Sequence, residues 1–278
     1  MPLQFDIRAI QKSKAPNAKV PNWLVRYLER ITHVREMNAF LRKHPDLREY
    51  DFIRLVIREE LGCSASITGL ENIPTDDKPV IFVSNHPLGG LDGMIIAELI
   101  HQARPDRPLK VIVNELLMFM EPIAGLWAPV NKVGRLTREQ ASEMQQMWES
   151  GCDVLTFPAG ACSRLQRLNG RWQIRDLEWH KNFVQRAREY QRDVVPVYFE
   201  GRNSSFFYAL AYLRKLFGIK LNIEMLYLVD EMYGAHGKHF RVHVLPSIPY
   251  TTFDKRHTPA EWAEYVKSIA YAINYTSC

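Results

Sequence analysis

The sequence has no long uninterrupted hydrophobic run. A helix that crosses a bilayer needs about 18 consecutive apolar residues, whereas the longest apolar segment here, 206–213, includes two tyrosines and stops at Arg214. We therefore expect no membrane-spanning helix. The N-terminal residues also lack the basic stretch, apolar segment and small-residue cleavage site of a secretory signal, which predicts a cytoplasmic protein.

Cysteine is scarce, and the four residues are Cys63, Cys152, Cys162 and Cys278. They form no CxxC pair and have no histidine at the spacing of zinc ligands. This pattern is typical of free thiols in a reducing compartment. We expect no metal and no redox cofactor.

Neither sign of charge is in large excess. The 36 lysines and arginines against 31 aspartates and glutamates leave a formal net charge of +5. This is too little to indicate nucleic-acid binding, but it favours an anionic partner such as a phosphate group or an anionic membrane surface. With 46% hydrophobic and 24% charged residues, a disordered chain is excluded, and 278 residues are enough for one or two domains.

Two kinds of hydrophobic pattern divide the chain. Apolar residues recur at three- and four-residue intervals from Trp23 to about Phe40, and a second helical pattern runs from Pro45 to Gly62. Residues 1–62 are therefore predicted to form an arm and a helical hairpin. After Gly62, short apolar strands alternate with helices, a pattern typical of a parallel sheet covered on both faces. The expected strands are 66–70, 79–84, 109–113, 153–157, 194–199 and 240–245, and the expected helices are 92–102, 142–150, 177–190 and one beginning at Pro259.

The predicted fold class is therefore α/β, with a largely parallel mixed sheet flanked by helices in residues 63–278. In such sheets, functional sites lie beyond the carboxyl ends of the strands. The segment 83–94 occupies that position, between a strand and a helix. It contains His86, a Gly89-Gly90 turn and Asp92, which could hydrogen-bond the imidazole and prepare it to accept a proton. Alone, the pattern is more typical of a loop histidine and a helix N-cap.

A second strand ends in the turn Phe157-Pro158-Ala159-Gly160, followed by Cys162-Ser163-Arg164. With Asn85-His86 and Asp92, blocks at 114–116 and 122–132, and Val195-Pro196-Val197, these residues resemble the ordered motifs of the glycerophospholipid (PlsC-like) acyltransferase superfamily. The best-known members of that superfamily acylate lysophosphatidic acid. The resemblance covers about 67–202, and four blocks in order are more specific than any one of them.

Two departures from the family pattern point to a branch. Five residues separate His86 and Asp92 instead of the usual four, and Ala159 and Cys162 replace a glutamate and an arginine. The His-Pro-Leu-Gly-Gly-Leu-Asp form is similar to the hemolysin-like branch. That branch includes bacterial enzymes that O-acylate lyso-aminolipids such as lyso-ornithine or lyso-glycine lipids.

The resemblance implies an O-acyltransferase that moves a fatty acyl group from acyl carrier protein or acyl-CoA to the hydroxyl of a lyso-aminolipid or lysophosphatidic acid. It would act peripherally on the inner face of the cytoplasmic membrane, with His86 as general base and Asp92 as its orienter. Arg164 is a candidate for binding an acidic group, against the alternative of a surface ion pair. The candidate substrate-binding residues are Asn85, Lys132, Arg135, Gly160, Ser163 and Arg164.

Three questions stay open at this point. Water could replace the lipid hydroxyl, which would make the protein a hydrolase, and Ala159 also leaves room for a lipid-binding protein without activity. A covalent mechanism at Cys162 is disfavoured because the sequence lacks a nucleophile elbow around it. The segment 206–217 predicts either a core helix or an interfacial element whose Arg214 and Lys215 would meet anionic headgroups.

Overall fold

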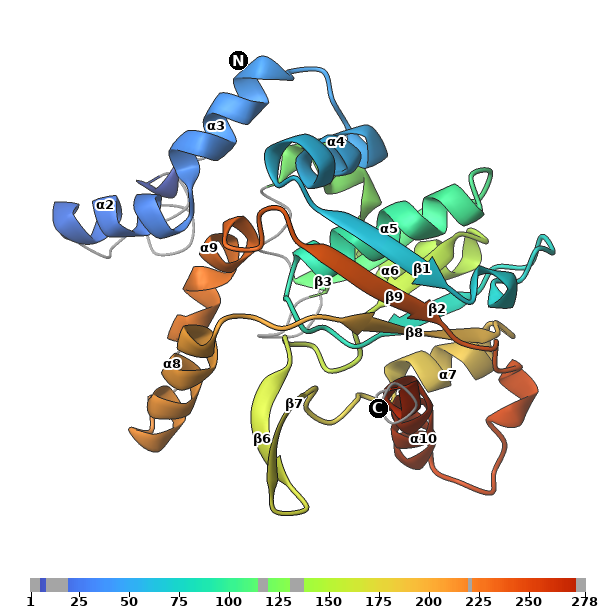
Figure 1. The fold of residues 1–278 in the computed structure, drawn as a ribbon. Coiled ribbons are helices and arrows are strands. Elements are labelled where there is room, and N and C mark those ends of the chain that lie inside the picture. The colour runs from blue at the N-terminus through green and yellow to red at the C-terminus, as the bar shows by residue number, and fades with distance from the viewer. Residues whose placement is uncertain (1–5, 9–19, 115–119, 131–137, 220–221, 274–278) are drawn as a thin grey trace.

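The computed structural model describes residues 6–8, 20–114, 120–130, 138–219 and 222–273. A seven-stranded sheet in the order β1-β9-β8-β2-β5-β3-β4 forms its centre (Figure 1). Neighbouring strands run parallel except β8 and β9, which are antiparallel. The strands are β1 (Ser64–Thr68), β2 (Ile81–Ser84), β3 (Leu109–Asn114), β4 (Trp127–Val130), β5 (Asp153–Thr156), β8 (Val194–Glu200) and β9 (His239–Val244).

Helices cover both faces of the sheet, which confirms the predicted α/β class. Strand β2 is buried throughout, so its alternating side chains enter two cores: Phe82 joins one, and Ile81 and Val83 join the other. The first core includes residues of α4 (Glu49–Leu55) and α5 (Leu91–Ala103). The second includes residues of α6 (Arg138–Glu149), α7 (Asn182–Glu189) and α10 (Pro259–Ala272). Short helical segments are η2 (Leu70–Asn72), η4 (Glu121–Leu126) and η6 (Tyr250–Thr252).

The N-terminal helices are present, but the single helix predicted from Trp23 to Phe40 is wrong. The structure has two, α2 (Asn22–Ile31) and α3 (Val34–Lys43), with a break where His33 adopts a left-handed backbone at φ 48°. The His33 ring stacks on Tyr233 with 4.1 Å between centroids, and its Nε2 lies 2.9 Å from Asp230 Oδ1. The residue at which the predicted helix is interrupted is therefore the one that contacts α9 (Leu228–Tyr233).

The second predicted helix ends before Gly62 as expected. It consists of α4 and a π-helical turn, η1 (Val56–Glu60), and Gly62 follows with φ 57°. Phe52 and Ile53 of α4 belong to the same core as one face of the sheet. The division into 1–62 and 63–278 stays a prediction.

A β-hairpin and a helix beside it extend from the sheet on the side of the β5 loop (Figure 1). The hairpin pairs β6 (Arg164–Leu168) with β7 (Arg171–Arg175), and both turn residues, Asn169 and Gly170, have positive φ. Helix α8 (Ser205–Leu216) lies against β6 and is followed by η5 (Ile223–Tyr227). Among the described residues, no helix combines the length and hydropathy needed to cross a membrane.

Candidate active site

His86 lies just beyond the carboxyl end of β2, and Asp92 lies in the first turn of α5. The imidazole Nδ1 is 3.1 Å from Asp92 Oδ2, with 17% of the His86 side chain exposed and none of Asp92. The two residues meet despite the additional residue between them. Gly89 absorbs it with φ +76°, and a Cβ there would approach Leu228 and Cys162 within about 3.1 Å, so a side chain would be strained and crowded.

Backbone donors fix the Asp92 carboxylate in place. Its Oδ2 accepts the N–H of Leu88 at 2.9 Å, and its Oδ1 accepts those of Gly90 and Gly93 at 3.0 and 2.9 Å. Burial acts to raise the pKa of Asp92, but the charge and hydrogen bond of His86 and the backbone N–H groups outweigh it and hold the pKa below its ordinary value. Asp92 is therefore ionised at neutral pH and places a proton on Nδ1, which leaves Nε2 as the basic nitrogen.

The second loop contacts the imidazole and its backbone. The ring of Phe157, just after β5, stacks on His86 with 4.1 Å between centroids. The N–H of Ser163 donates to the His86 carbonyl at 2.8 Å. Because β2 and β5 are paired neighbours, the two loop motifs predicted from the sequence meet at one edge of the sheet.

Asp176, which the sequence analysis did not identify, ties these loops together. It is 1% exposed, and its Oδ1 accepts Ser163 Oγ at 2.6 Å and the His86 N–H at 3.2 Å. Its Oδ2 accepts Trp179 Nε1 at 2.9 Å, and its own N–H donates to the Tyr271 hydroxyl at 2.9 Å. Burial raises the pKa of Asp176, and the hydrogen bonds from Ser163 and Trp179 only partly offset it.

Three of the residues predicted to bind substrate form hydrogen bonds within the protein. Asn85 is buried, and its amide both donates to and accepts from the backbone of Phe199 in β8. The Ser163 hydroxyl is held by Asp176, and the Gly160 N–H donates to the Phe157 carbonyl at 2.9 Å. These residues shape the loops around His86. Lys132 and Arg135 lie outside the described residues.

A family model described as acyltransferase matches residues 9–277. The chain belongs to this acyltransferase family. It is 43% identical over 271 residues to a lyso-glycine lipid O-acyltransferase of Bacteroides thetaiotaomicron, covering 97% of each chain. It is 42% identical to the protein of the same name from Phocaeicola vulgatus, covering 97% of this chain and 95% of that one. The crystal structure of the Thermotoga maritima 1-acyl-sn-glycerophosphate acyltransferase PlsC aligns with a TM-score of 0.48 at 16% identity, covering 98% of this chain and 88% of that one.

Arg164 of the acyltransferase joins a buried ion-pair cluster and not a surface pair. Its Nη2 is 2.9 Å from Oε1 of Glu224, and Arg214 Nε is 2.9 Å from Oε2 of the same carboxylate. Glu224 is fully buried, whereas 13% of the Arg164 side chain is exposed. Two guanidinium groups share one carboxylate, so the cluster has a net positive charge. Glu224 follows the hydrophobic segment 206–217 and has no sequence pattern that pairs it with Arg164.

The thiol of Cys162 is inaccessible in the acyltransferase. It is fully buried beside Arg164 Nη1 and Met225, and burial raises its pKa to about 11 even though the nearby guanidinium favours the thiolate. A neutral, buried thiol is a poor nucleophile. Cys152 is buried as well, at 3% exposed. Within the described ranges, no three His, Cys, Asp or Glu side chains gather as metal ligands.

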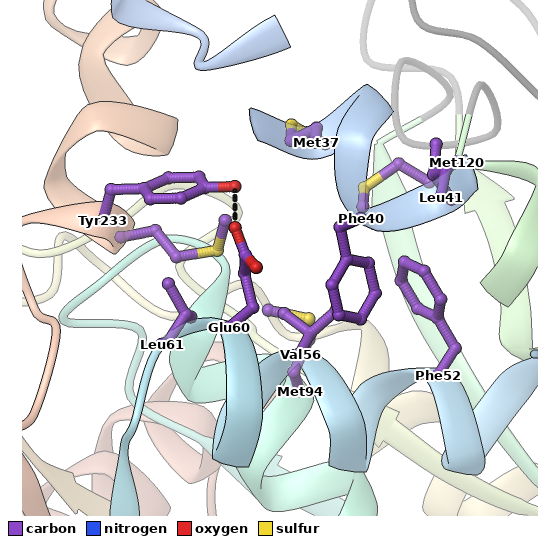
Figure 2. Close-up of a pocket in the computed structure, with 11 residues that line it drawn as sticks. Met37, Phe40, Leu41, Phe52, Val56, Glu60, Leu61, Met94, Met120 and Tyr233 are labelled. Carbon is purple, nitrogen blue, oxygen red and sulfur yellow. Dashed lines mark hydrogen bonds between the residues drawn. The ribbon is translucent and has the colours of Figure 1, made fainter. Parts of the chain in front are cut away.

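An apolar pocket of the acyltransferase lies between the N-terminal helices, α5 and α9 (Figure 2). About 420 Å³ of space free of protein atoms lies inside the pocket and across its mouth, which is open to solvent. Met94, two residues after Asp92 on α5, is part of its wall, and Tyr233 donates to Glu60 Oε1 across one end at 3.0 Å. The rest of the wall is Met37, Phe40, Leu41, Phe52, Val56, Leu61, Met120 and Met232.

Proposed function

We propose that this acyltransferase moves a fatty acyl group from an acyl carrier protein or CoA thioester to the hydroxyl of a lyso-lipid, with a lyso-aminolipid of the lyso-glycine type as first choice. The observation that carries the proposal is the His86–Asp92 pair, which leaves Nε2 as the basic nitrogen of a side chain that is 17% exposed. The acceptor is suggested by the two relatives, which are similar over nearly their whole length.

The reaction needs one proton acceptor. Nε2 of His86 removes the proton of the acceptor hydroxyl as the oxygen attacks the thioester carbonyl carbon. The tetrahedral intermediate then collapses, the carbon–sulfur bond breaks, and the leaving thiolate takes the proton from the imidazolium, which Asp92 stabilises meanwhile. General-base assistance of this kind contributes about 10²–10⁴ in rate. The thioester is a co-substrate, and the proposal includes no metal or other cofactor.

Two further parts of the molecule fit such substrates. Arg164, whose side chain is 13% exposed and whose cluster has a net positive charge, would bind the anionic group of the acceptor. The apolar pocket opens beside α5, the helix that carries Asp92, and its Met, Phe, Leu and Val side chains would contact part of an acyl chain. The protein would act peripherally, on the inner face of the cytoplasmic membrane.

The test incubates the purified protein with labelled acyl carrier protein and acyl-CoA. Each donor is offered lyso-glycine lipid, lyso-ornithine lipid and lysophosphatidic acid, with mass spectrometry of the products. We expect the doubly acylated glycine lipid to accumulate. Free fatty acid without acylated lipid would show that water is the acceptor, and turnover of lysophosphatidic acid alone would overturn the choice of headgroup.

A further inference from the structure

Helix α8 presents an apolar face that no described part of the chain covers. Phe207, Tyr208 and Ala211 point inward, where Phe207 and Tyr208 form a small core with Cys162. The outer face is apolar as well, since Leu216 is 66% and Phe217 74% exposed. Contiguous exposed apolar side chains of this kind mark an interaction surface. The other exposed apolar side chains here are Phe206, Tyr212, Leu213, Ile219 and Leu226.

The β6–β7 hairpin extends this face. Trp172 of β7 is 55% exposed and makes an edge contact with Tyr212 of α8, with 5.9 Å between ring centroids. Figure 1 shows the hairpin projecting from the body of the protein on the same side as α8. The α8–hairpin surface, as we call it, consists of the exposed apolar side chains of α8 together with Phe217, Ile219, Leu226 and Trp172.

The two segments that contribute most of the α8–hairpin surface contain only positive charges, while the carboxylate of Glu231 lies at the N-terminal end of α8, where it accepts from Ser204. Residues 164–175 and 201–219 contain no aspartate or glutamate, and together they contain seven lysines and arginines. Arg167 and Arg171 on the hairpin and Lys215 on α8 are exposed. Glu224, the carboxylate of the ion-pair cluster, is buried and is shared by Arg164 and Arg214. Aromatic and aliphatic side chains ringed by cations match the interfacial region of an anionic bilayer.

The surface is also continuous with the candidate active site. Arg164 is the first residue of β6 and lies over the ring of Phe207 in α8 at 5.5 Å. Its neighbour Ser163 is hydrogen-bonded to the carbonyl of His86. A bilayer against α8 and the hairpin would therefore contact a strand, β6, that begins one residue after Ser163, which is hydrogen-bonded to the backbone of the proposed base.

We propose that the α8–hairpin surface docks the protein on an anionic membrane, with the apolar side chains inserted at headgroup depth and Arg167, Arg171 and Lys215 contacting lipid phosphates. This inference rests on the proposed function, because a lipid acceptor has to be taken from a bilayer. An acidic carrier protein would also be attracted to the cations, but it offers no apolar phase for side chains as large as Leu216, Phe217 and Trp172.

The experiment is co-sedimentation of the full chain with vesicles of phosphatidylglycerol and phosphatidylethanolamine, and with vesicles of phosphatidylcholine. The double variant Leu216→Glu/Phe217→Glu should lower the partition coefficient on the anionic vesicles by at least about tenfold, because it replaces inserted side chains with charges that the lipid repels. Lys215→Glu/Arg171→Glu should weaken binding to anionic vesicles and remove most of its salt dependence.

The matched control is Leu70→Glu. Leu70 is also exposed, at 46%, but it follows β1, which ends at the edge of the sheet opposite to His86 because β9, its parallel partner, is antiparallel to β8. We expect Leu70→Glu to bind vesicles like the wild type. Equal binding by the wild type and the Leu216/Phe217 variant would overturn the proposal. The proposal would also be overturned if the Leu216/Phe217 variant bound vesicles like the wild type but lost affinity for acyl carrier protein. The same holds if the variant bound vesicles normally but lost self-association in sedimentation velocity.

A second measurement separates this proposal from the proposed function. On a short-chain lyso-lipid kept below its critical micelle concentration, the Leu216/Phe217 variant should turn over at the wild-type rate, while its rate on vesicle-embedded acceptor falls. If the wild type binds vesicles but transfers no acyl group to any acceptor, the function is overturned and the surface stands. If transfer is unaffected by vesicles and by the variant, the surface is overturned and the function stands.

Discussion

The imidazole Nδ1 of His86 lies 3.1 Å from Oδ2 of Asp92, and the same oxygen accepts the backbone N–H of Leu88. The carboxylate that orients the histidine is therefore also a structural part of the loop between them. Substitutions at the two positions should have different consequences, because one removes a proton acceptor and the other also disturbs the loop.

His86→Ala should lower the rate of acyl transfer by about 10²–10⁴ or more, the usual contribution of a general base. Its melting temperature should fall as well, since the substitution removes the imidazole that pairs with the buried Asp92 carboxylate and stacks on Phe157. His180→Ala, at an exposed histidine beyond the second loop, is the control and should retain full activity. Wild-type turnover by His86→Ala would rule out the proposed base.

Asp92→Asn should impair both activity and stability. An amide cannot accept both the Nδ1–H of His86 and all three backbone N–H groups, so the imidazole loses its tautomer and one buried donor is left unpaired, at about 1–3 kcal/mol. Kinetics and thermal unfolding measure the two effects separately. Full stability with reduced activity would show that the loop does not depend on the carboxylate.

The loss of folding stability at low pH is a second measurement that tests Asp92→Asn. The pKa of Asp92 is below its ordinary value in the folded protein, so its ionisation stabilises the fold above the unfolded-state pKa. That contribution is lost as the pH falls through the folded-state pKa. Asp92→Asn should therefore show a flatter loss of stability below about pH 4 than the wild type, as measured by urea unfolding at several pH values.

Asp176→Ala should reduce activity without any direct contact with a substrate. It leaves Ser163 Oγ, Trp179 Nε1 and the His86 N–H without their acceptor, and each unpaired buried donor costs about 1–3 kcal/mol. Thermal unfolding should show a clear loss, and kcat should fall more than KM rises. Asp176→Asn, which keeps one acceptor oxygen, should recover part of both; equal damage by the two substitutions would contradict the hydrogen-bond explanation.

Glu224→Gln should destabilise the protein because it leaves two guanidinium groups facing each other across a neutral amide. Removing one member of a buried ion pair costs up to about 3–5 kcal/mol, and the partial exposure of Arg164 and Arg214 places this case toward the lower end. The double variant Glu224→Gln/Arg214→Gln should be more stable than the single one, as a double-mutant cycle would measure. Strict additivity would show that the carboxylate does not couple the two arginines.

Cys162 should be unreactive and dispensable as a nucleophile. Its pKa is raised to about 11 by burial, so the thiol is protonated at pH 8. Peptide mass spectrometry after iodoacetamide treatment of the native protein should find Cys162 unmodified, and Cys162→Ser should retain acyl transfer. A covalent acyl group on Cys162 in trapped reaction mixtures would overturn the direct-transfer mechanism.

The sequence predicts those parts of the molecule that depend on local pattern. Apolar, β-branched runs such as 79–84 and 194–199 correctly predict the strands that are buried on both faces. The loops of His86 and Phe157 meet because β2 and β5 are adjacent. The hairpin was missed although Asn169-Gly170 is a strong turn signal. Six of the ten strand residues are arginine or glutamine, and β6 shows no hydrophobic alternation, although Trp172 and Ile174 alternate with polar residues in β7.

The remaining features depend on contacts between residues far apart in the chain. Asp176 follows a polar strand and reads as a loop carboxylate until the fold brings it against the backbone of His86, 90 residues earlier. The break at His33 involves Tyr233 and Asp230, which lie about two hundred positions downstream. No local propensity records such pairings.

The order of the strands also determines how late in synthesis the central sheet can form. β1 pairs with β9, whose residues 239–244 leave the ribosome about 175 positions later, and β9 in turn joins β1 to β8. Until then the first strand has exposed hydrogen-bonding groups, and the helices before it lack part of the core on which they pack. Non-local pairing of this kind slows folding and exposes strand edges to aggregation. A chain that stalls before residue 239 would therefore be a target for chaperones and proteases, even though both candidate catalytic residues have already been made.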